Sequence, residues 1–178
     1  SFNKNKIIFF EQPTFPKSKK DRTLLVIKLI KLAEFNKDIE ILIKPRFNEK
    51  IGHAHRPKYL LQDIFNKIDN KPSNISISYN HIYDLFKTCK LALTISSTAG
   101  LESLLVGIPT LFITDFCKKQ NLYGSNDFKK FNATISFNDL YNNKIPKINF
   151  DSIGNILKFD GKNTSRLAQE LIFLSKEV

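Results

Sequence analysis

The chain contains no tryptophan and no methionine, and only two of its 178 residues are cysteines. Cys89 and Cys117 stand far apart, and no Cys/His cluster has the spacing of zinc ligands, so the sequence predicts no metal site. Two isolated cysteines are typical of a protein kept reduced in the cytosol. No apolar run approaches the roughly 20 residues that cross a bilayer, and no signal peptide is visible. We therefore expect a cytoplasmic protein.

Several motifs of well-known enzyme classes are also missing. The sequence has no G-x-S-x-G motif and no Ser–His–Asp order, which argues against a serine hydrolase. It has neither the phosphate loop G-x-x-x-x-G-K-[ST] nor the dinucleotide fingerprint G-x-G-x-x-G. We therefore expect no bound cofactor and, in particular, no NAD site.

The chain is rich in positively charged residues and in hydrophobic residues. Lysine and arginine outnumber the acidic residues by 28 to 17, which gives a net charge of +11, and 42% of the residues are hydrophobic. This length and composition predict one domain over residues 1–178. The charge favours an anionic partner, namely nucleic acid, anionic lipid or a phosphorylated small molecule. The lysines are scattered and the aromatics occupy expected core positions, so we expect no nucleic-acid partner; a basic anion-binding module stays an alternative.

Hydrophobic patterning predicts strands that alternate with helices. The expected strands span residues 6–11, 39–44, 75–79, 91–95, 110–113 and 133–136, and the expected helices span 22–35, 58–68, 81–89, 99–106 and 162–176. Residues 128–143 suggest a further helix before the last strand and a turn after it. This order predicts right-handed βαβ crossovers. The fold class is therefore a Rossmann-like three-layer α/β/α domain with a mostly parallel sheet of about six strands.

Polar residues follow five of the expected strands, where ligands bind in open parallel sheets. They are Gln12 and Thr14, Lys44 and Arg46, Asn80 and His81, the run Ser96-Ser97-Thr98, and Asp115. Lys44 and Arg46 flank Pro45 on one loop and could neutralise a phosphate, with the arginine bonding in a bidentate manner. We therefore expect one polar rim built from several loops.

The run from Ser96 to Thr98 falls where a buried strand passes into a helix. One hydroxyl can cap that helix, and the cluster could also hold a phosphate against the helix N-terminus. Gly100 would let a ligand approach the first turn closely. Glu102, expected in that turn, either stabilises the helix dipole or accepts hydrogen bonds from a ribose diol. Both interpretations remain open from the residues alone.

A loop with the sequence GHAHRPKY carries His53 and His55. Two histidines two residues apart, without a third ligand nearby, are a poor metal site. A loop that binds phosphate or carboxylate and a plain solvent-exposed loop are both consistent with this stretch.

With these residues in view, the chain resembles the C-terminal, nucleotide-sugar-binding domain of GT-B glycosyltransferases. The resemblance rests on the stretches FFEQPTFP, ILIKPRFNEKIGHAHRP, SSTAGLESLLVGIPTLFITDF and NLYGSNDF, and it covers about residues 6–137. A looser similarity links the chain to bacterial sialyltransferases and Kdo transferases, which hold the CMP of a CMP-sugar with a His-Pro motif and a Ser-Ser/Thr motif. Ser96, Ser97 and Thr98 match the second motif, whereas Arg56 separates His55 from Pro57 in the first.

The resemblance implies a transferase of surface polysaccharide or lipooligosaccharide synthesis, acting on a nucleotide-sugar and on a glycan or lipid-linked acceptor. It implies catalysis without a metal ion, and a catalytic base in an N-terminal domain that would precede Ser1. The chain would then be a fragment of a two-domain protein, inactive alone and located in the cytoplasm or at the inner face of the membrane. CDP-glycerol and UDP-sugar enzymes of similar layout are the nearest alternatives.

Overall fold

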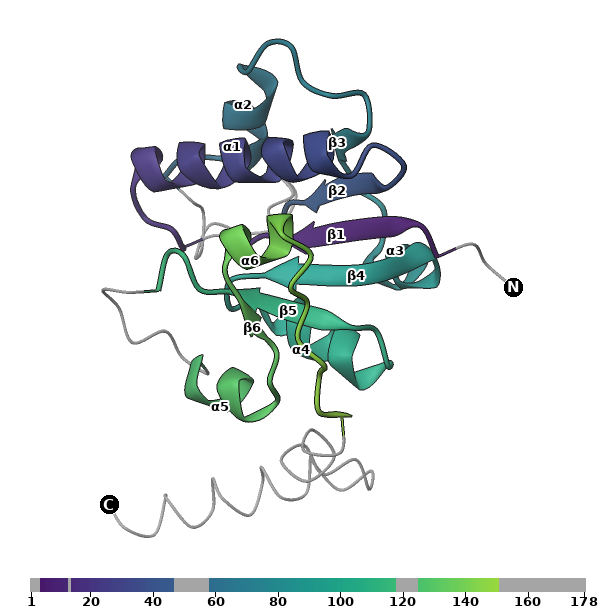
Figure 1. The fold of residues 1–178 in the computed structure, drawn as a ribbon. Coiled ribbons are helices and arrows are strands. Elements are labelled where there is room, and N and C mark those ends of the chain that lie inside the picture. Colours follow the sequence, from purple (N-terminus) through teal and green to yellow (C-terminus); the bar gives the residue numbers. More distant parts are fainter. Residues whose placement is uncertain (1–3, 13, 47–57, 118–124, 151–178) are drawn as a thin grey trace, which may run out of the picture.

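The computed structural model describes residues 4–12, 14–46, 58–117 and 125–150. At its centre lies a six-stranded sheet in which every neighbouring pair of strands is parallel. The strands are β1 (Lys6–Phe10), β2 (Glu40–Lys44), β3 (Ile75–Ile77), β4 (Cys89–Thr94), β5 (Thr110–Ile113) and β6 (Thr134–Ile135), in the order β3-β2-β1-β4-β5-β6 (Figure 1). The predicted Rossmann-like fold class is confirmed.

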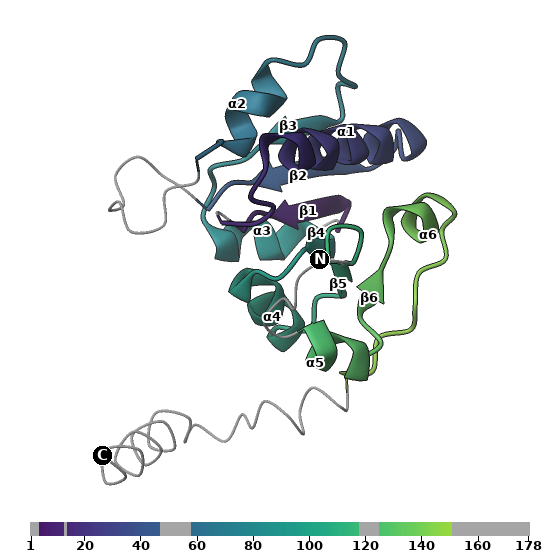
Figure 2. The ribbon, with the colours of Figure 1, turned by 90° about the vertical axis from the view of Figure 1, so that its left-hand side faces the viewer.

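Helices lie on both faces of the sheet. They are α1 (Lys19–Phe35), α2 (Leu61–Asn66), α3 (Ile82–Thr88), α4 (Thr98–Leu105), α5 (Ser125–Lys130) and α6 (Phe137–Tyr141). Helices α1 and α6 cover one face, and α3 and α4 cover the other, as Figure 2 shows from the side. None of the helices within the described residues is long and apolar enough to cross a membrane.

The strands alternate between the two cores because successive side chains of a strand point to opposite faces. In β1, Ile7 and Phe9 pack with α1, whereas Ile8 and Phe10 pack with α3. All four of these side chains are buried. A near-continuous apolar run is what a central strand of a covered parallel sheet requires.

The last described helix corrects one expectation. A turn was expected after the strand at residues 133–136, but residues Phe137–Tyr141 form α6. Ser136 caps this helix by accepting a hydrogen bond from the Asp139 backbone N–H (3.1 Å). The helix is too short for its periodicity to be recognised, and it is held by tertiary contacts. The expected helix at 162–176 lies outside the described residues.

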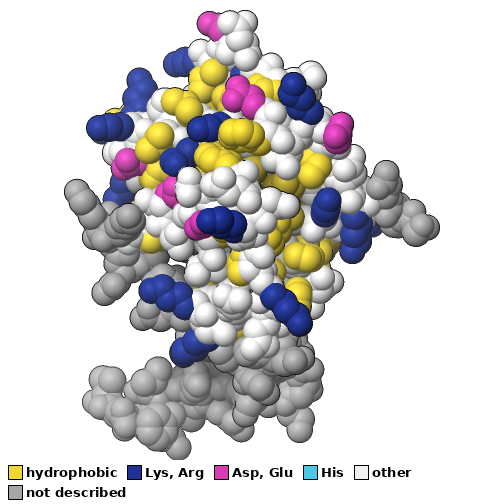
Figure 3. All heavy atoms as spheres, in the orientation of Figure 1, with side chains coloured by type: hydrophobic (Ala, Val, Ile, Leu, Met, Phe, Trp, Pro, Cys, Tyr) yellow, Lys and Arg dark blue, Asp and Glu magenta, His cyan; other side chains and the backbone are white. Residues whose placement is uncertain are grey.

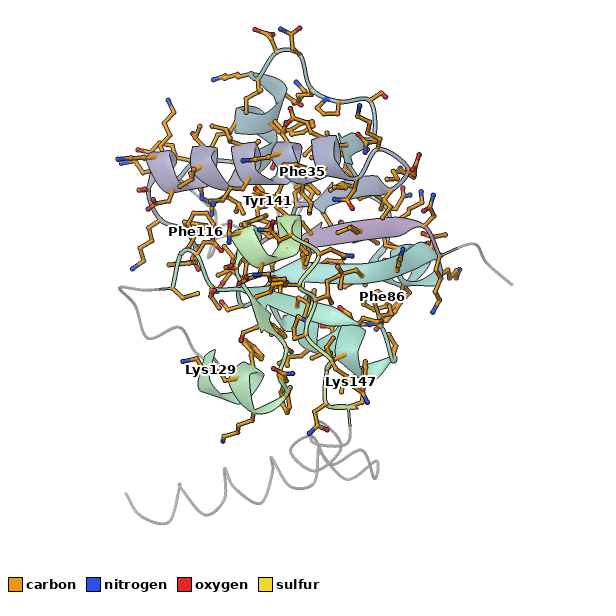
Figure 4. All side chains as sticks on the ribbon, viewed as in Figure 1. Phe35, Phe86, Phe116, Lys129, Tyr141 and Lys147 are labelled. Carbon is orange, nitrogen blue, oxygen red and sulfur yellow. The ribbon has the colours of Figure 1, made fainter. Side chains whose placement is uncertain are left out.

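Tyr141 joins α6 to α1. Its hydroxyl donates to the Lys28 carbonyl oxygen (2.8 Å), and its ring centroid lies 5.4 Å from that of Phe35. Figure 4 shows Tyr141 between the two helices, near Phe35. This contact joins α6, which follows the edge strand β6, to α1, which follows β1.

Gly100 lets α4 approach the sheet. A Cβ atom at this position would lie 2.6 Å from Thr94 Cγ2 and 3.2 Å from Phe112 Cε1. The Thr94 side chain cannot turn aside freely, because its hydroxyl donates to the Phe10 carbonyl oxygen (2.9 Å) and accepts from the Ser97 N–H (3.1 Å). Glycine at this position therefore allows α4 to pack closely against the sheet.

We expect Gly100→Ala to destabilise the protein by roughly 1–3 kcal/mol, the usual cost of overpacking. The steric clash should outweigh the gain in helix propensity, which is about 1 kcal/mol. Urea unfolding measures the change. Val106→Ala, at an exposed position beyond the same helix, serves as the control and should shift stability by no more than about 0.5 kcal/mol. Equal stability of Gly100→Ala and the parent chain would contradict this account.

Candidate functional site at the carboxyl edge of the sheet

Because all strands are parallel, they end at one edge of the sheet, which faces the viewer in Figure 2. Between β1 and β4 the helices that follow the strands leave toward opposite faces, which is where open α/β sheets bind ligands. A cavity of about 240 Å³ lies here. It is lined by Phe10, Glu11, Lys44, Pro45, Arg46, Ile82, Ser97, Thr98, Ala99 and Glu102.

The turn from β4 into α4 is fixed by hydrogen bonds. Ser97 is the N-cap of α4, and its hydroxyl accepts from the Ala99 N–H (3.3 Å). The Ser97 N–H itself donates to Thr94, whose hydroxyl reaches the carbonyl oxygen of Phe10 on β1 (2.9 Å). The end of β1 and the start of α4 are therefore held in register around the cavity.

The start of α4 presents donors to this cavity. Thr98 is the first residue of the helix, its side chain is exposed, and it lines the cavity together with Ala99. Ser97 is buried and uses its oxygen as the cap, so its hydroxyl hydrogen can still be donated. The two hydroxyl groups and the positive end of the helix dipole make this position favourable for an anion.

Two cations line the same cavity. Lys44 ends β2 and is half-buried, and its ammonium group donates to the Pro45 carbonyl oxygen (3.4 Å). Burial lowers the pKa of Lys44 below its ordinary value. Arg46 is exposed, two residues further along the same loop. An anion in the cavity would offset the desolvation of the lysine.

Glu102 lines the cavity, but not from the first turn of the helix as expected. Helix α4 begins at Thr98, so Glu102 lies in its second turn, and the first turn contains no acidic residue. This excludes the capping-box role and weakens the helix-dipole role, since both act in the first turn. The carboxylate is exposed and free to accept hydrogen bonds from a ligand in the cavity.

The remaining candidate residues do not line this cavity. The Ser96 hydroxyl hydrogen-bonds the Gln12 side chain and so joins the loop after β4 to the loop after β1. Thr14 is exposed nearby. Gly100 is buried against the sheet, which is a different reason for glycine from the one expected. His55 lies outside the described residues.

Asp115, the polar residue expected after β5, has a structural role. One of its carboxylate oxygens pairs with Lys28 (3.1 Å) and the other accepts from the Phe137 N–H (2.8 Å). It borders a separate cavity of about 860 Å³ on the α1–α6 side of the same edge. His81 begins α3 without capping it and rests its ring against Tyr83.

A buried ion pair beside the cavity was not predicted. Glu11 and Arg22 are joined at 2.7 Å, and both side chains are 1% exposed. Burial raises the pKa of Glu11, and the Arg22 guanidinium opposes that rise. One signal was present in the sequence: Arg22 stands three, four and seven residues before Leu25, Val26 and Leu29, on the core face of α1.

Comparison with known proteins identifies the family of this chain. Residues 1–150 match a protein family described as "Putative glycosyltransferase (DUF6716)". The chain belongs to this family. Among curated proteins, no significant match was found for this chain.

Solved structures share the fold of this chain at low sequence identity. TarM is 17% identical with a TM-score of 0.61, and the match covers 98% of this chain and 36% of TarM. SnogD, a glycosyltransferase from Streptomyces nogalater, is 9% identical with a TM-score of 0.54 over 89% of this chain and 40% of its own. UDP-GlcNAc 2-epimerase from Neisseria meningitidis is 11% identical with a TM-score of 0.54, covering 90% and 45%. The chain thus spans less than half the length of these proteins.

Breaking the buried pair of Glu11 and Arg22 should strongly lower the stability of the protein. Arg22→Gln should lower the free energy of unfolding by about 3–5 kcal/mol, because it leaves the Glu11 charge buried without its partner. Lys6→Gln is the matched control, since its pair with Glu40 (2.7 Å) is partly exposed to solvent and should contribute at most about 1 kcal/mol. Urea unfolding at pH 7 compares the two variants. A similar loss of unfolding free energy in both variants would contradict the view that burial makes breaking the Glu11–Arg22 pair more costly.

Proposed function

We propose that this chain is the donor-binding domain of a glycosyltransferase, and that its ligand is a nucleotide-sugar. The observation that carries the proposal is the composition of one cavity at the switch point of the sheet. Lys44 and Arg46, the start of α4 and the carboxylate of Glu102 surround it. Membership of a glycosyltransferase family supports this choice over other phosphorylated ligands.

In this proposal the nucleotide phosphates lie between the two cations and the α4 N-terminus. Thr98 and Ser97 donate their hydroxyl hydrogens to phosphate oxygens, and Glu102 accepts from the ribose diol. The cavity, at about 240 Å³, is smaller than the roughly 300–1,000 Å³ typical of complete small-molecule sites. It would therefore hold the phosphates and ribose, with other parts of the donor outside it.

The reaction we propose is displacement at the anomeric carbon of the bound sugar. The cations and the helix dipole would stabilise the charge that develops on the leaving phosphate, and no metal ion would be needed. The chain spans 36–45% of the three solved neighbours described above, which supports the view that it forms only part of a larger enzyme. From the resemblance of its motifs we assign it to the C-terminal half of a two-domain enzyme. The catalytic base and the acceptor site would then come from the other half, and this chain alone would be inactive.

The acceptor in this proposal is a glycan or a lipid-linked glycan of the bacterial surface. Cytoplasmic synthesis at the inner face of the membrane fits a net charge of +11, since basic faces are attracted to anionic lipid. The Ser-Ser-Thr run favours CMP as the nucleotide. A structure of S. aureus TarM is a complex that includes UDP, and the Neisseria epimerase is bound to UDP-GlcNAc, so UDP is the second candidate.

The alternative of a basic module for anionic lipid or nucleic acid is less well supported. On the face drawn in Figure 3, Lys and Arg side chains are spread among acidic and apolar ones rather than gathered in one patch. A module of that kind would bind DNA or anionic vesicles with a steep dependence on salt concentration.

Calorimetric titration at moderate salt tests the donor site. We expect CMP or UDP to bind the chain. The affinities for CDP and UMP then show how much the base and the number of phosphates contribute to binding. Binding should survive physiological salt, and DNA should not compete. If none of the four nucleotides binds at millimolar concentration, the proposed function is wrong.

The hydroxyl pair gives a sharper test. Ser97→Ala with Thr98→Ala should cost ~1 kcal/mol of stability through the lost cap. Each lost hydrogen bond to a charged phosphate should cost a further ~1.5–3 kcal/mol of binding, or about tenfold or more in affinity. Ser136→Ala removes a comparable cap from α6, away from the cavity, and should leave affinity unchanged. Melting curves and calorimetry together separate the two effects. Parent-like affinity in the double variant would make the hydroxyls a cap only.

The two cations should distinguish a nucleotide from its nucleoside. Lys44→Ala and Arg46→Ala should each weaken nucleotide binding by about tenfold, because they remove a charge-assisted contact to phosphate. Nucleoside affinity should hardly change. Lys90→Ala removes the same charge from an exposed position at the amino end of β4 and serves as the control. Equal losses of affinity for nucleotide and nucleoside would contradict a contact between these cations and the phosphate.

A further inference from the structure

Glu11 is the first residue after β1 and forms part of the cavity wall. Its backbone N–H donates to the Lys44 carbonyl oxygen (3.1 Å), so the residue continues the pairing between β1 and β2. It is only 2% exposed, and it lines the cavity with Lys44, Arg46 and the start of α4. Glu11 therefore lies beside the groups to which we assign the phosphates.

One carboxylate oxygen of Glu11 is firmly held. Oε1 accepts from Arg22 Nη1 at 2.7 Å. The same guanidinium donates from Nε to the Pro16 carbonyl oxygen (2.8 Å) and from Nη2 to the Gln12 carbonyl oxygen (3.3 Å). Arg22 thus fixes the Glu11 side chain in one orientation and ties it to the loop that follows β1.

The other oxygen has no partner. Among the described residues, no group hydrogen-bonds Oε2 of Glu11, although this atom is fully buried. The Arg46 backbone N–H lies close enough to lower the Glu11 pKa, against the larger effect of burial, but it does not complete a hydrogen bond to Oε2. Buried polar atoms are nearly always satisfied, and an unsatisfied one in a cavity wall points to a partner that a ligand supplies.

A phosphate cannot be that partner, because both groups are negatively charged. The hydrogen-bond donors that a nucleotide-sugar carries close to its phosphates are the hydroxyl groups of the ribose and of the transferred sugar. A cavity with cations on one side and a carboxylate oxygen on the other is suited to a phosphate with a neighbouring hydroxyl.

We propose that Oε2 of Glu11 accepts a hydrogen bond from a hydroxyl group of the bound donor, next to the phosphates held by Lys44 and Arg46. The proposal rests on the proposed function and names one further contact within it. Glu11 would make the cavity selective for hydroxylated phosphate esters over anions that lack a hydroxyl.

The test compares how one variant and the parent chain bind ligands that keep or lack hydroxyl groups. Glu11→Gln keeps the shape of the side chain and an oxygen for Arg22, but it replaces the charged acceptor by a neutral amide. The ligands are UDP and CMP, their 2′,3′-dideoxy analogues, and UDP-GlcNAc and CMP-sialic acid. Calorimetry measures each affinity for the parent chain and the variant, and melting curves establish that both are folded.

We expect Glu11→Gln to weaken binding of hydroxyl-bearing ligands about tenfold. Ligands that lack the hydroxyl should bind the variant as tightly as the parent or more tightly, because a negative charge near the phosphates has gone. If the ribose supplies the hydroxyl, the loss appears with UDP or CMP and vanishes with the dideoxy analogue. If the transferred sugar supplies it, the loss appears only with the nucleotide-sugar.

Glu40→Gln, at the opposite end of β2, is the matched control and should change none of these affinities. If Glu11→Gln does not fold, Glu11→Gln combined with Arg22→Gln removes both buried charges and should show the same ligand pattern. An equal loss for all ligands would make Glu11 a purely structural residue and would overturn the inference, as would no loss for any. Failure of the parent chain to bind any nucleotide would instead refute the proposed function itself.

Discussion

The position of the site depends on the directions in which the chain leaves two neighbouring strands. β1 and β4 are neighbours and parallel, yet the helices that follow them pack on opposite faces of the sheet. The two loops must therefore separate at the carboxyl edge, and the space between them cannot be filled by either helix. The Thr94 hydroxyl, bonded to both Phe10 and Ser97, holds the two sides of this opening at a fixed distance. Every group assigned to the ligand lies around it.

The charges around the opening are balanced rather than uniformly positive. Lys44 and Arg46 face two carboxylates, Glu11 and Glu102, and Glu11 is already paired with Arg22. The net charge of +11 therefore says little about the cavity, because most of the basic residues lie elsewhere on the chain. A site of mixed charge favours a ligand that carries phosphates and hydroxyls together over a simple anion.

Apolar runs such as those of β1 and β4 were enough to predict the sheet, since a parallel strand covered on both faces must be apolar throughout. Position after a strand was enough to find Lys44, Arg46, Ser97 and Thr98, all of which line the cavity. It could not separate them from Ser96 and Gln12, which bond each other, because side-chain direction in a loop is set by tertiary contacts. The roles of Gly100 and Arg22 likewise depend on what packs against them, which no local pattern contains.

The central place of β1 has a consequence for how the chain folds. β1 is the first strand among the described residues, and it pairs with β2 on one side and with β4 on the other, where Phe10 and Thr94 are 84 positions apart. During synthesis one edge of β1 therefore lacks its partner until β4, about 80 residues later in the chain, has left the ribosome. Contacts this distant in sequence slow folding, and unpaired strand edges invite association. The strand that supplies Glu11 to the cavity is thus also the one whose completion must wait for the rest of the sheet.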